Sequence, residues 1–295
     1  MITFRKTSIF IIAAIVLVAN GLRFFDLERT PKGFSIDEIG TVLSSYCLPV
    51  TDPATHIKTW PVFNDIGFGS PYPLTLIYPM HVWSHVFGIS TGATRAFEAF
   101  IYILALFGVF FLARLLGGSA CAWLSLLAAS ISPWGWMFSR IAFEAILAPS
   151  FLVWGAFFFL RNKRGLDMLL AALMIAGAMY TYAPMRLYGP LLILLMFAYQ
   201  SGRSWIPWRR YFGFFLALVL LCVPMALGYL HGELQGRFSG LSIGSPDYLR
   251  ALGKTNSFAD LAGVFLNNFF CTLIPSSFLH VAIIIPVMPR NSLAS

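Results

Sequence analysis

Two adjacent carboxylates, Asp37 and Glu38, occur in a chain of 295 residues that has only 12 acidic residues. They follow the first apolar run after a short polar connector. A positioned carboxylate removes the proton of an attacking hydroxyl, and such general-base catalysis accelerates a reaction about 10²–10⁴-fold. Asp37 is therefore the first candidate for a general base. The alternative is that both acids belong to a helix N-terminus, where the helix dipole stabilises each by about 0.3–1 kcal/mol.

Glu38 is expected to act differently from Asp37, because adjacent residues do not share a helical face. Ser35 stands three residues before Glu38, which is the spacing of a capping box. This pattern predicts a short helix that begins at Ile36 and runs to about Leu48. Two interpretations are open: Glu38 caps this helix, or it orients an arginine or binds an acceptor.

Two arginines lie near carboxylates at helical spacing, Arg95 with Glu98 and Arg140 with Glu144. A planar guanidinium matches phosphate oxygens, and it would stabilise a phosphate leaving group as charge develops. Arg186 is a third arginine of this kind. The alternative interpretation is a surface ion pair worth about 0.2–0.5 kcal/mol.

His81 and His85 have the i,i+4 spacing that suits a shared metal ion, but no HExxH motif surrounds them. Packing with Trp83 at a membrane interface is the favoured interpretation of this stretch. No metal site is predicted from these residues.

The composition indicates an all-α polytopic membrane protein. The chain is 58% hydrophobic and 11% charged, with a mean hydropathy of +0.77, whereas soluble domains carry about 25% charged residues. The net charge of +8 does not indicate nucleic-acid binding, because most of the basic excess falls in short loops, where it sets membrane topology.

About seven transmembrane helices are predicted within one membrane domain, 1–295. A large first external loop, 23–92, carries surface helices, and a later external loop covers 231–277. If 70–88 is a surface helix, seven basic residues lie at the inner helix ends and three at the outer ends. This distribution favours the surface helix, because Lys and Arg are more frequent on the cytoplasmic side. The predicted spans are 9–22, 94–115, 120–137, 142–160, 166–180, 187–199 and 211–230. Gly117-Gly118 are predicted to form the turn between the second and the third span.

Several motifs, taken in order, resemble those of the polytopic C-type glycosyltransferases. The most similar members are the protein O-mannosyltransferases and the lipid A aminoarabinose transferases. The resemblance covers nearly the whole chain. The motifs that carry it are Asp37-Glu38, Pro71-Tyr72-Pro73-Leu74, Thr94-Arg95-Ala96-Phe97, Leu115-Leu116-Gly117-Gly118, Ser132-Pro133 through Ser139-Arg140 with Glu144, and Tyr180-Thr181-Tyr182 with Arg186.

The resemblance implies an enzyme that moves a sugar from a polyprenyl-phosphate donor to a hydroxyl of a protein, lipid or glycan acceptor. Transfer would invert the configuration at the anomeric carbon of the sugar. Asp37 would be the base, and the reaction would take place at the periplasmic face of the cytoplasmic membrane. Glu38 would be a second residue of the catalytic site. Family members differ in metal dependence, so a divalent metal is left open, and they are usually longer, so a C-terminally truncated chain is expected. The residues implied in donor binding are Arg95, Arg140, Glu144, Tyr182 and Arg186.

Two other classes of protein compete with this interpretation. A transporter or flippase predicts inverted repeats and ionisable residues near the membrane midplane, whereas here the ionisable residues gather at helix ends. The other alternative is an inactive fragment or an assembly subunit of a glycosyltransferase.

Overall fold

The computed structural model describes residues 6–49, 63–64, 72–202, 208–230 and 263. The chain divides into two compact units, Met1–Leu234 and Gln235–Ser295, and the described helices and strands lie in the first. The predicted external loop 231–277, apart from residue 263, lies outside the described residues. Part of the predicted loop 23–92 does so as well.

The described residues are almost wholly helical, which confirms the predicted all-α class for this part of the chain. Besides the turns and loops that connect the helices, they include two short antiparallel strands, β1 (Phe63–Asn64) and β2 (Tyr72–Pro73). The described helices are α1 (Lys6–Leu22), α2 (Ile36–Tyr46), α3 (Leu74–Phe87), α4 (Thr91–Ile131), α5 (Pro133–Phe138), α6 (Glu144–Arg161), α7 (Gly165–Thr181), α8 (Met185–Ser201) and α9 (Trp208–Leu230).

Three of these helices, α4, α6 and α9, are long and apolar enough to cross a membrane. They indicate a membrane protein. The helices α1 and α7 are also apolar but have only 17 residues each. The count of seven spans goes beyond these observations and stays a prediction.

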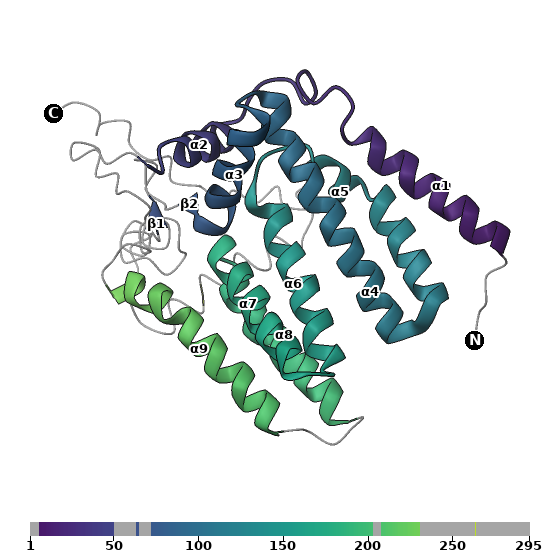
Figure 1. Ribbon diagram of the computed structural model, residues 1–295, viewed down its shortest axis with the longest axis vertical. Coiled ribbons are helices and arrows are strands. Elements are labelled where there is room, and N and C mark those ends of the chain that lie inside the picture. Colours follow the sequence, from purple (N-terminus) through teal and green to yellow (C-terminus); the bar gives the residue numbers. More distant parts are fainter. Residues whose placement is uncertain (1–5, 50–62, 65–71, 203–207, 231–262, 264–295) are drawn as a thin grey trace. The chain divides into compact units, whose positions relative to one another are not determined.

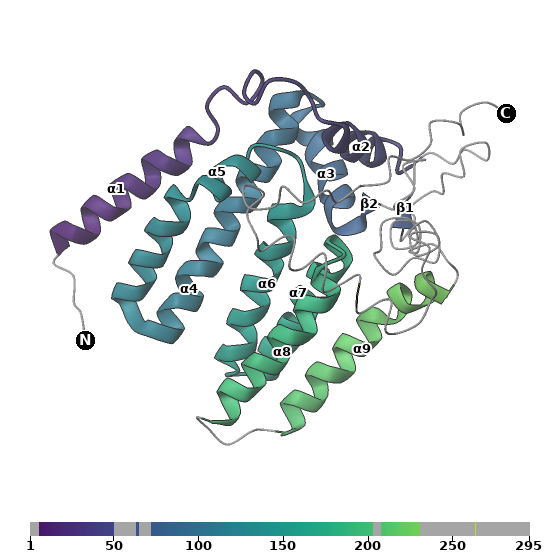
Figure 2. The same ribbon diagram turned by 180° about the vertical axis from the view of Figure 1, so that it is seen from behind.

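Helix α4 consists of two segments that meet at Gly118. This residue has φ 79° and ψ −170°, and the chain folds back there (Figures 1 and 2). That backbone conformation is open almost only to glycine. The break confirms the turn predicted at Gly117-Gly118.

The predicted span 120–137 is divided, which corrects the sequence analysis. Helix α4 ends at Ile131, Ser132 adopts φ −59° and ψ 125°, and α5 begins at Pro133. Proline lacks a backbone N–H and disfavours a helical conformation in the residue before it. A proline at the first position of a helix is well tolerated, and the Ser132 hydroxyl accepts a hydrogen bond from the Gly135 N–H.

The main hydrophobic core lies among α6, α7, α8 and α9. Small residues let α6 and α7 approach closely, as in other membrane bundles. A Cβ added at Gly155 would lie 2.8 Å from Ile175 Cγ1. The large buried residues of this core include Phe159, Met168, Ile175, Ile193, Tyr211 and Phe214.

The left-handed turn at Gly118 generates the first prediction. Replacing Gly118 by Ala should destabilise the protein by about 1–3 kcal/mol, because a Cβ is strained at this φ. The matched control is Gly213→Ala in α9, where nothing lies within 4 Å of the new Cβ. Helix propensity should make that change neutral or stabilising, by up to about 1 kcal/mol. Thermal unfolding in detergent measures both variants, and equal melting temperatures would contradict the assigned turn.

Candidate functional site

The capping box at the start of α2 is present as predicted. The Glu38 N–H donates to Ser35 Oγ at 3.2 Å, and the Ser35 N–H donates to Glu38 Oε2 at 2.9 Å. The helix begins at Ile36, as predicted, and ends at Tyr46, two residues before the predicted end. The local sequence therefore determines where α2 begins and places Asp37 and Glu38 in its first turn.

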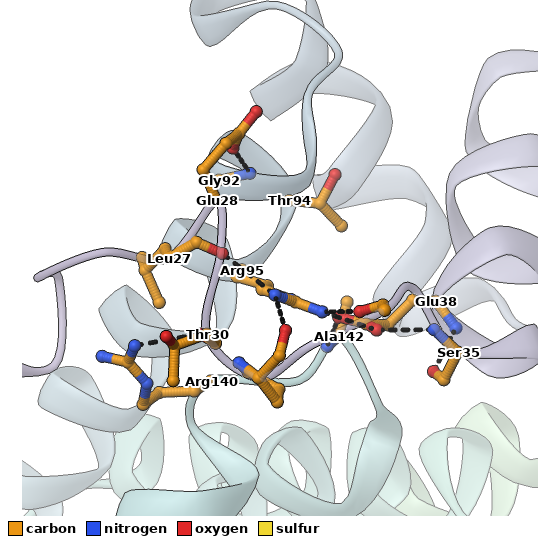
Figure 3. A network of polar contacts seen from close by, with 12 residues as sticks. Leu27, Glu28, Thr30, Ser35, Glu38, Gly92, Thr94, Arg95, Arg140 and Ala142 are labelled. Atoms are coloured by element: carbon orange, nitrogen blue, oxygen red, sulfur yellow. Dashed lines mark hydrogen bonds and ion pairs between the residues drawn. The ribbon is translucent and has the colours of Figure 1, made fainter.

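Glu38 also forms a buried ion pair with Arg95. Arg95 Nε lies 2.8 Å from Glu38 Oε1 and Nη2 lies 3.2 Å from Oε2, and both side chains are about 1–2% exposed. Both interpretations of Glu38, helix capping and orienting an arginine, are thus confirmed together (Figure 3). The interpretation of Arg95 with Glu98 as an ion pair is wrong, because Arg95 reaches across to α2 for its carboxylate.

The hydrogen bonds to Glu38 decide its ionisation. Burial raises the pKa of this carboxyl, but the hydrogen bonds from the Arg95 guanidinium and the Ser35 N–H, with the Arg95 charge, outweigh burial and lower the pKa below its ordinary value. Glu38 therefore stays ionised and paired at neutral pH. It is a poor candidate for accepting a proton during a reaction.

Arg95 uses its other donors to hold the connection between α1 and α2. Its Nη1 group donates to Leu27 O at 3.0 Å and to Pro31 O at 2.9 Å, and Nη2 donates to Gly33 O at 2.6 Å. A guanidinium has five N–H donors, and all five of them have protein acceptors here (Figure 3). Phosphate binding by Arg95 stays a prediction that this arrangement does not favour.

Arg140 holds the same connection from the other side. It lies between α5 and α6 rather than within a helix, so the predicted i,i+4 pair with Glu144 on one helix is wrong. Burial and the nearby positive charge of Arg95 lower the pKa of Arg140, a shift that Asp26 opposes. The guanidinium donates to four backbone carbonyls, those of Leu22, Arg23, Phe25 and Thr30, at 2.9–3.3 Å.

A third buried arginine, Arg23, was missed by the sequence analysis. Its side chain is fully buried and donates to Asn20 Oδ1, Ser130 O, Gly135 O and Ser139 Oγ at 2.6–3.0 Å. The guanidinium carbon lies 4.2 Å from the centre of the Tyr102 ring, a favourable cation–π contact. The sequence feature that could have indicated this buried site is an arginine directly after an apolar run, at the start of the predicted loop 23–92.

Asp37 differs from Glu38 in being exposed. Its carboxylate has no hydrogen bond or ion pair with any other residue of the described ranges. Because Glu38 is fixed by Ser35 and Arg95, the backbone that carries Asp37 is fixed too. The result is an accessible carboxylate on a rigid helix start.

The start of α2 lies near the ends of three other elements. The α5–α6 connection reaches α2 and α7, and α7 reaches α3. The Ala142 N–H donates to Glu38 Oε1 at 3.4 Å. The ring centres of Phe143 and Tyr182 lie 6.4 Å apart. The hydroxyl oxygens of Thr75 and Thr181 lie 2.6 Å apart. Four polypeptide segments that are distant in sequence are therefore linked by a series of contacts that starts at Glu38, the neighbour of the candidate base.

The remaining predicted residues lie at these same helix ends. Arg186 is half-buried; its Nε donates to Met179 O at 3.2 Å and its Nη1 donates to the Tyr229 hydroxyl. Unlike Arg95, it has only these two bonds to described residues. Glu144 is the half-buried first residue of α6.

Glu98 is fully buried close to Glu38 and Glu144. Neither of its carboxyl oxygens has a hydrogen-bond partner within the part of the chain that the structure describes. The same part contains no group of three or more His, Cys, Asp or Glu side chains that is arranged to hold a metal ion.

An apolar cavity of about 440 Å³ lies next to the contact between Thr75 and Thr181. Thr75, whose hydroxyl contacts Thr181, lines one part of it, and Phe158 and Met174 line another. Its walls come from α3, α4, α6 and α7, and include Pro79, Leu104, Leu147, Phe151 and Trp154. The volume is in the range of small-molecule sites.

No protein-family model and no curated protein sequence matches the chain.

The Glu38–Arg95 pair generates the second prediction. Glu38→Gln should destabilise the protein by about 3–5 kcal/mol, because it leaves a buried guanidinium without its counter-charge. The matched control is the exposed neighbour, Asp37→Asn, for which the expected change is within about 0.5 kcal/mol. Thermal or denaturant unfolding measures both variants. Equal losses in the two variants would contradict the assignment of Glu38 as the buried partner.

The lowered pKa of Glu38 generates the third prediction. A carboxyl whose pKa is lower in the folded state adds stability above its unfolded pKa, about 4.3 for glutamate. That stability is lost as the pH falls through the folded pKa. We expect the melting temperature of the wild type to fall more steeply below about pH 4.3 than that of Glu38→Gln. Parallel pH profiles of the two proteins would show that Glu38 does not carry the effect.

Proposed function

We propose that this chain is a membrane glycosyltransferase that moves a sugar from a polyprenyl-phosphate donor to an acceptor hydroxyl, with inversion at the sugar carbon. The acceptor is a protein, lipid or glycan. The observation that carries the proposal is the contrast between two adjacent acids. Asp37 is exposed, while Glu38 is buried and locked by Arg95.

Asp37 is the general base in this proposal. It would accept the proton of the acceptor hydroxyl as the oxygen attacks the anomeric carbon. Glu38 and Arg95 act as positioning residues, because they fix the first turn of α2 and both side chains are buried. Because the helix start is fixed, the Asp37 carboxylate loses little further freedom when the reacting groups come together. Holding a catalytic group in the right geometry in this way is a large part of what positioning contributes to catalysis.

Arg186 is the favoured ligand of the donor phosphate, with Tyr182 beside it. Its guanidinium is half-buried, and only two of its hydrogen bonds go to described residues. A guanidinium fork suits phosphate oxygens and would stabilise the leaving polyprenyl phosphate. In this proposal Arg140, like Arg95, acts chiefly by holding the α1–α2 connection in place.

The polyprenyl tail would occupy the apolar cavity between α3, α4, α6 and α7. Along α6 the lining residues extend from Leu147 to Phe158, which is roughly 16 Å at 1.5 Å per residue. The cavity begins at Thr75, whose hydroxyl contacts that of Thr181. A lipid tail in this cavity would therefore place its phosphate near Arg186 and Tyr182.

The proposed membrane arrangement has seven spans: α1, the two segments of α4, α6, α7, α8 and α9. Helices α2 and α3 would lie on the outer surface. The site would face the periplasm from the cytoplasmic membrane. Contacts of Arg140 with the end of α1 and of Arg186 with the end of α9 support this arrangement, because they gather the proposed outer ends together.

The fourth prediction tests the base directly. Membranes that contain the chain are incubated with radiolabelled polyprenyl-phosphate sugars, and transfer to endogenous acceptors is counted. Asp37→Asn should lower transfer by about 10²–10⁴-fold. The control is Asp26→Asn, another exposed acid, whose left-handed backbone (φ 53°) suits asparagine equally well. It should retain the wild-type rate.

Three outcomes separate the alternatives. Loss of transfer in Asp37→Asn with unchanged unfolding supports the proposed base. Undiminished transfer in that variant would refute the role of Asp37 while keeping the enzyme class. The absence of transfer from the wild type with several sugar donors would favour the transporter or assembly-subunit interpretation.

A further inference from the structure

Four helices have an end at one side of the main core: α6 and α8 end there, and α7 and α9 begin there (Figures 1 and 2). Gln200, near the end of α8, donates to Leu160 O on α6 at 2.9 Å. Arg210, in the first turn of α9, donates through Nη1 to Asn162 O at 2.6 Å. Because Asn162 caps the end of α6, the second contact joins the start of α9 to the turn between α6 and α7.

One buried acid holds the turn between α6 and α7. Asp167 accepts hydrogen bonds from the N–H groups of Lys163 at 2.7 Å and Arg164 at 3.1 Å, and it pairs with the Arg161 guanidinium. The Asp167 side chain is only 2% exposed. Its charge is therefore compensated within the turn, by Arg161.

Three further basic residues at this end are exposed: Lys163 and Arg164 in the turn, and Arg209 at the start of α9. Their side chains have no hydrogen bond or ion pair with another residue of the described ranges. Lys163 and Arg209 are the chain neighbours of Asn162 and Arg210, which are in contact although they lie 48 positions apart. Positive charge from two distant segments is therefore brought to one place.

The exposed charges near the opposite end of α6 have both signs. The α1–α2 connection and the first turn of α2 expose Arg29 and Lys32 together with Asp26, Glu28 and Asp37. By contrast, the exposed charged residues of the α6–α7 turn and of the first turn of α9 are all positive. Within the described residues, exposed charge of a single sign thus distinguishes this end of α6 from the other.

Exposed apolar side chains adjoin the basic ones. Leu166 and Leu169 follow Arg164 on α7, and Trp208 and Phe212 lie in the first two turns of α9. Helices α6 and α9 are long and apolar enough to cross a membrane, so their ends are expected at a membrane surface. Basic and apolar side chains side by side at that depth match the phosphate and the hydrocarbon chains of a lipid. A nucleic acid or a soluble acidic protein offers no such chains.

We propose that the α6–α7 turn and the first turn of α9 form a surface that binds anionic phospholipids. Lys163, Arg164 and Arg209 are the side chains that attract the phosphate groups, and the hydrocarbon chains lie along the exposed apolar side chains. Arg210 is a positioning residue, because its bond to Asn162 holds the two segments together. The preference of Lys and Arg for one side of a membrane accounts for a basic end, but it does not require two segments to join their exposed charges.

Bound anionic lipid should stabilise the chain. Its phosphate groups compensate positive charges that otherwise repel one another, and a ligand that binds only the folded state raises the melting temperature. The lipid surface is independent of the proposed sugar transfer. Its residues belong to the end of α6, whereas the contacts that lead to Glu38 and Asp37 come from the connection before the start of α6. Either proposal survives failure of the other.

The fifth prediction compares two matched charge variants. Purified protein in a neutral detergent is mixed with phosphatidylglycerol or phosphatidylcholine, and bound lipid is counted by native mass spectrometry. We expect the wild type to prefer phosphatidylglycerol and to melt at a higher temperature in its presence. Lys163→Gln with Arg209→Gln should weaken this binding about tenfold. The control, Lys32→Gln with Arg29→Gln, also removes one exposed lysine and one exposed arginine, and should bind like the wild type.

Salt and a soluble anion separate a lipid surface from mere positive charge. Raising the salt concentration from about 0.1 M to about 1 M shortens the screening length from about 10 Å to about 3 Å, and this should remove the preference. Inorganic phosphate at the concentration of the lipid should not displace it. Both variants should melt like the wild type without lipid, since all four residues are exposed. Equal binding of the two lipids, equal losses in the two variants, persistence of the preference in high salt, or displacement by phosphate would each overturn the proposal.

Discussion

The buried contact between Arg95 and Glu38 is the interaction on which the arrangement of the neighbouring helix ends depends. One guanidinium on α4 binds the first turn of α2 through a carboxylate and the α1–α2 connection through three carbonyls. Removing two charges from water is costly, and a buried ion pair is favourable only when its remaining donors and acceptors are satisfied. Arg95 meets that condition with all five donors, so this one side chain sets the geometry of two segments at once.

The other buried arginines also have their hydrogen-bond donors satisfied, but by different partners. Arg23 and Arg140 donate mainly to backbone carbonyls, and aromatic rings of Tyr102 and Trp136 lie over their guanidinium groups. A buried charge is tolerable when hydrogen-bonding dipoles replace its water shell. Together with those of Arg95, these contacts hold the connection between α1 and α2 in place. They leave Asp37 as an exposed carboxylate on a rigid support, which is what a positioned base requires.

This arrangement changes how the basic residues are interpreted. The resemblance to glycosyltransferases assigns the donor phosphate to Arg95 and Arg140, whereas their hydrogen bonds make them positioning residues in the described conformation. In the proposed function the phosphate is therefore assigned to Arg186, which has two bonds to described residues.

By itself, the sequence determined the features that depend on neighbours within a few residues. The apolar runs predicted the helical class, Ser35 and Glu38 predicted the capping box, and Gly117-Gly118 predicted the break in α4, because helix formation, capping and left-handed turns are local effects. Only the tertiary structure decided which charges meet. Arg95 was expected to pair with Glu98, three residues away, but pairs with Glu38, 57 positions distant in the chain. The physical reason is that a buried guanidinium must satisfy all of its donors, and one carboxylate on the same helix cannot do this, so the partners come from whichever segments the fold brings around it.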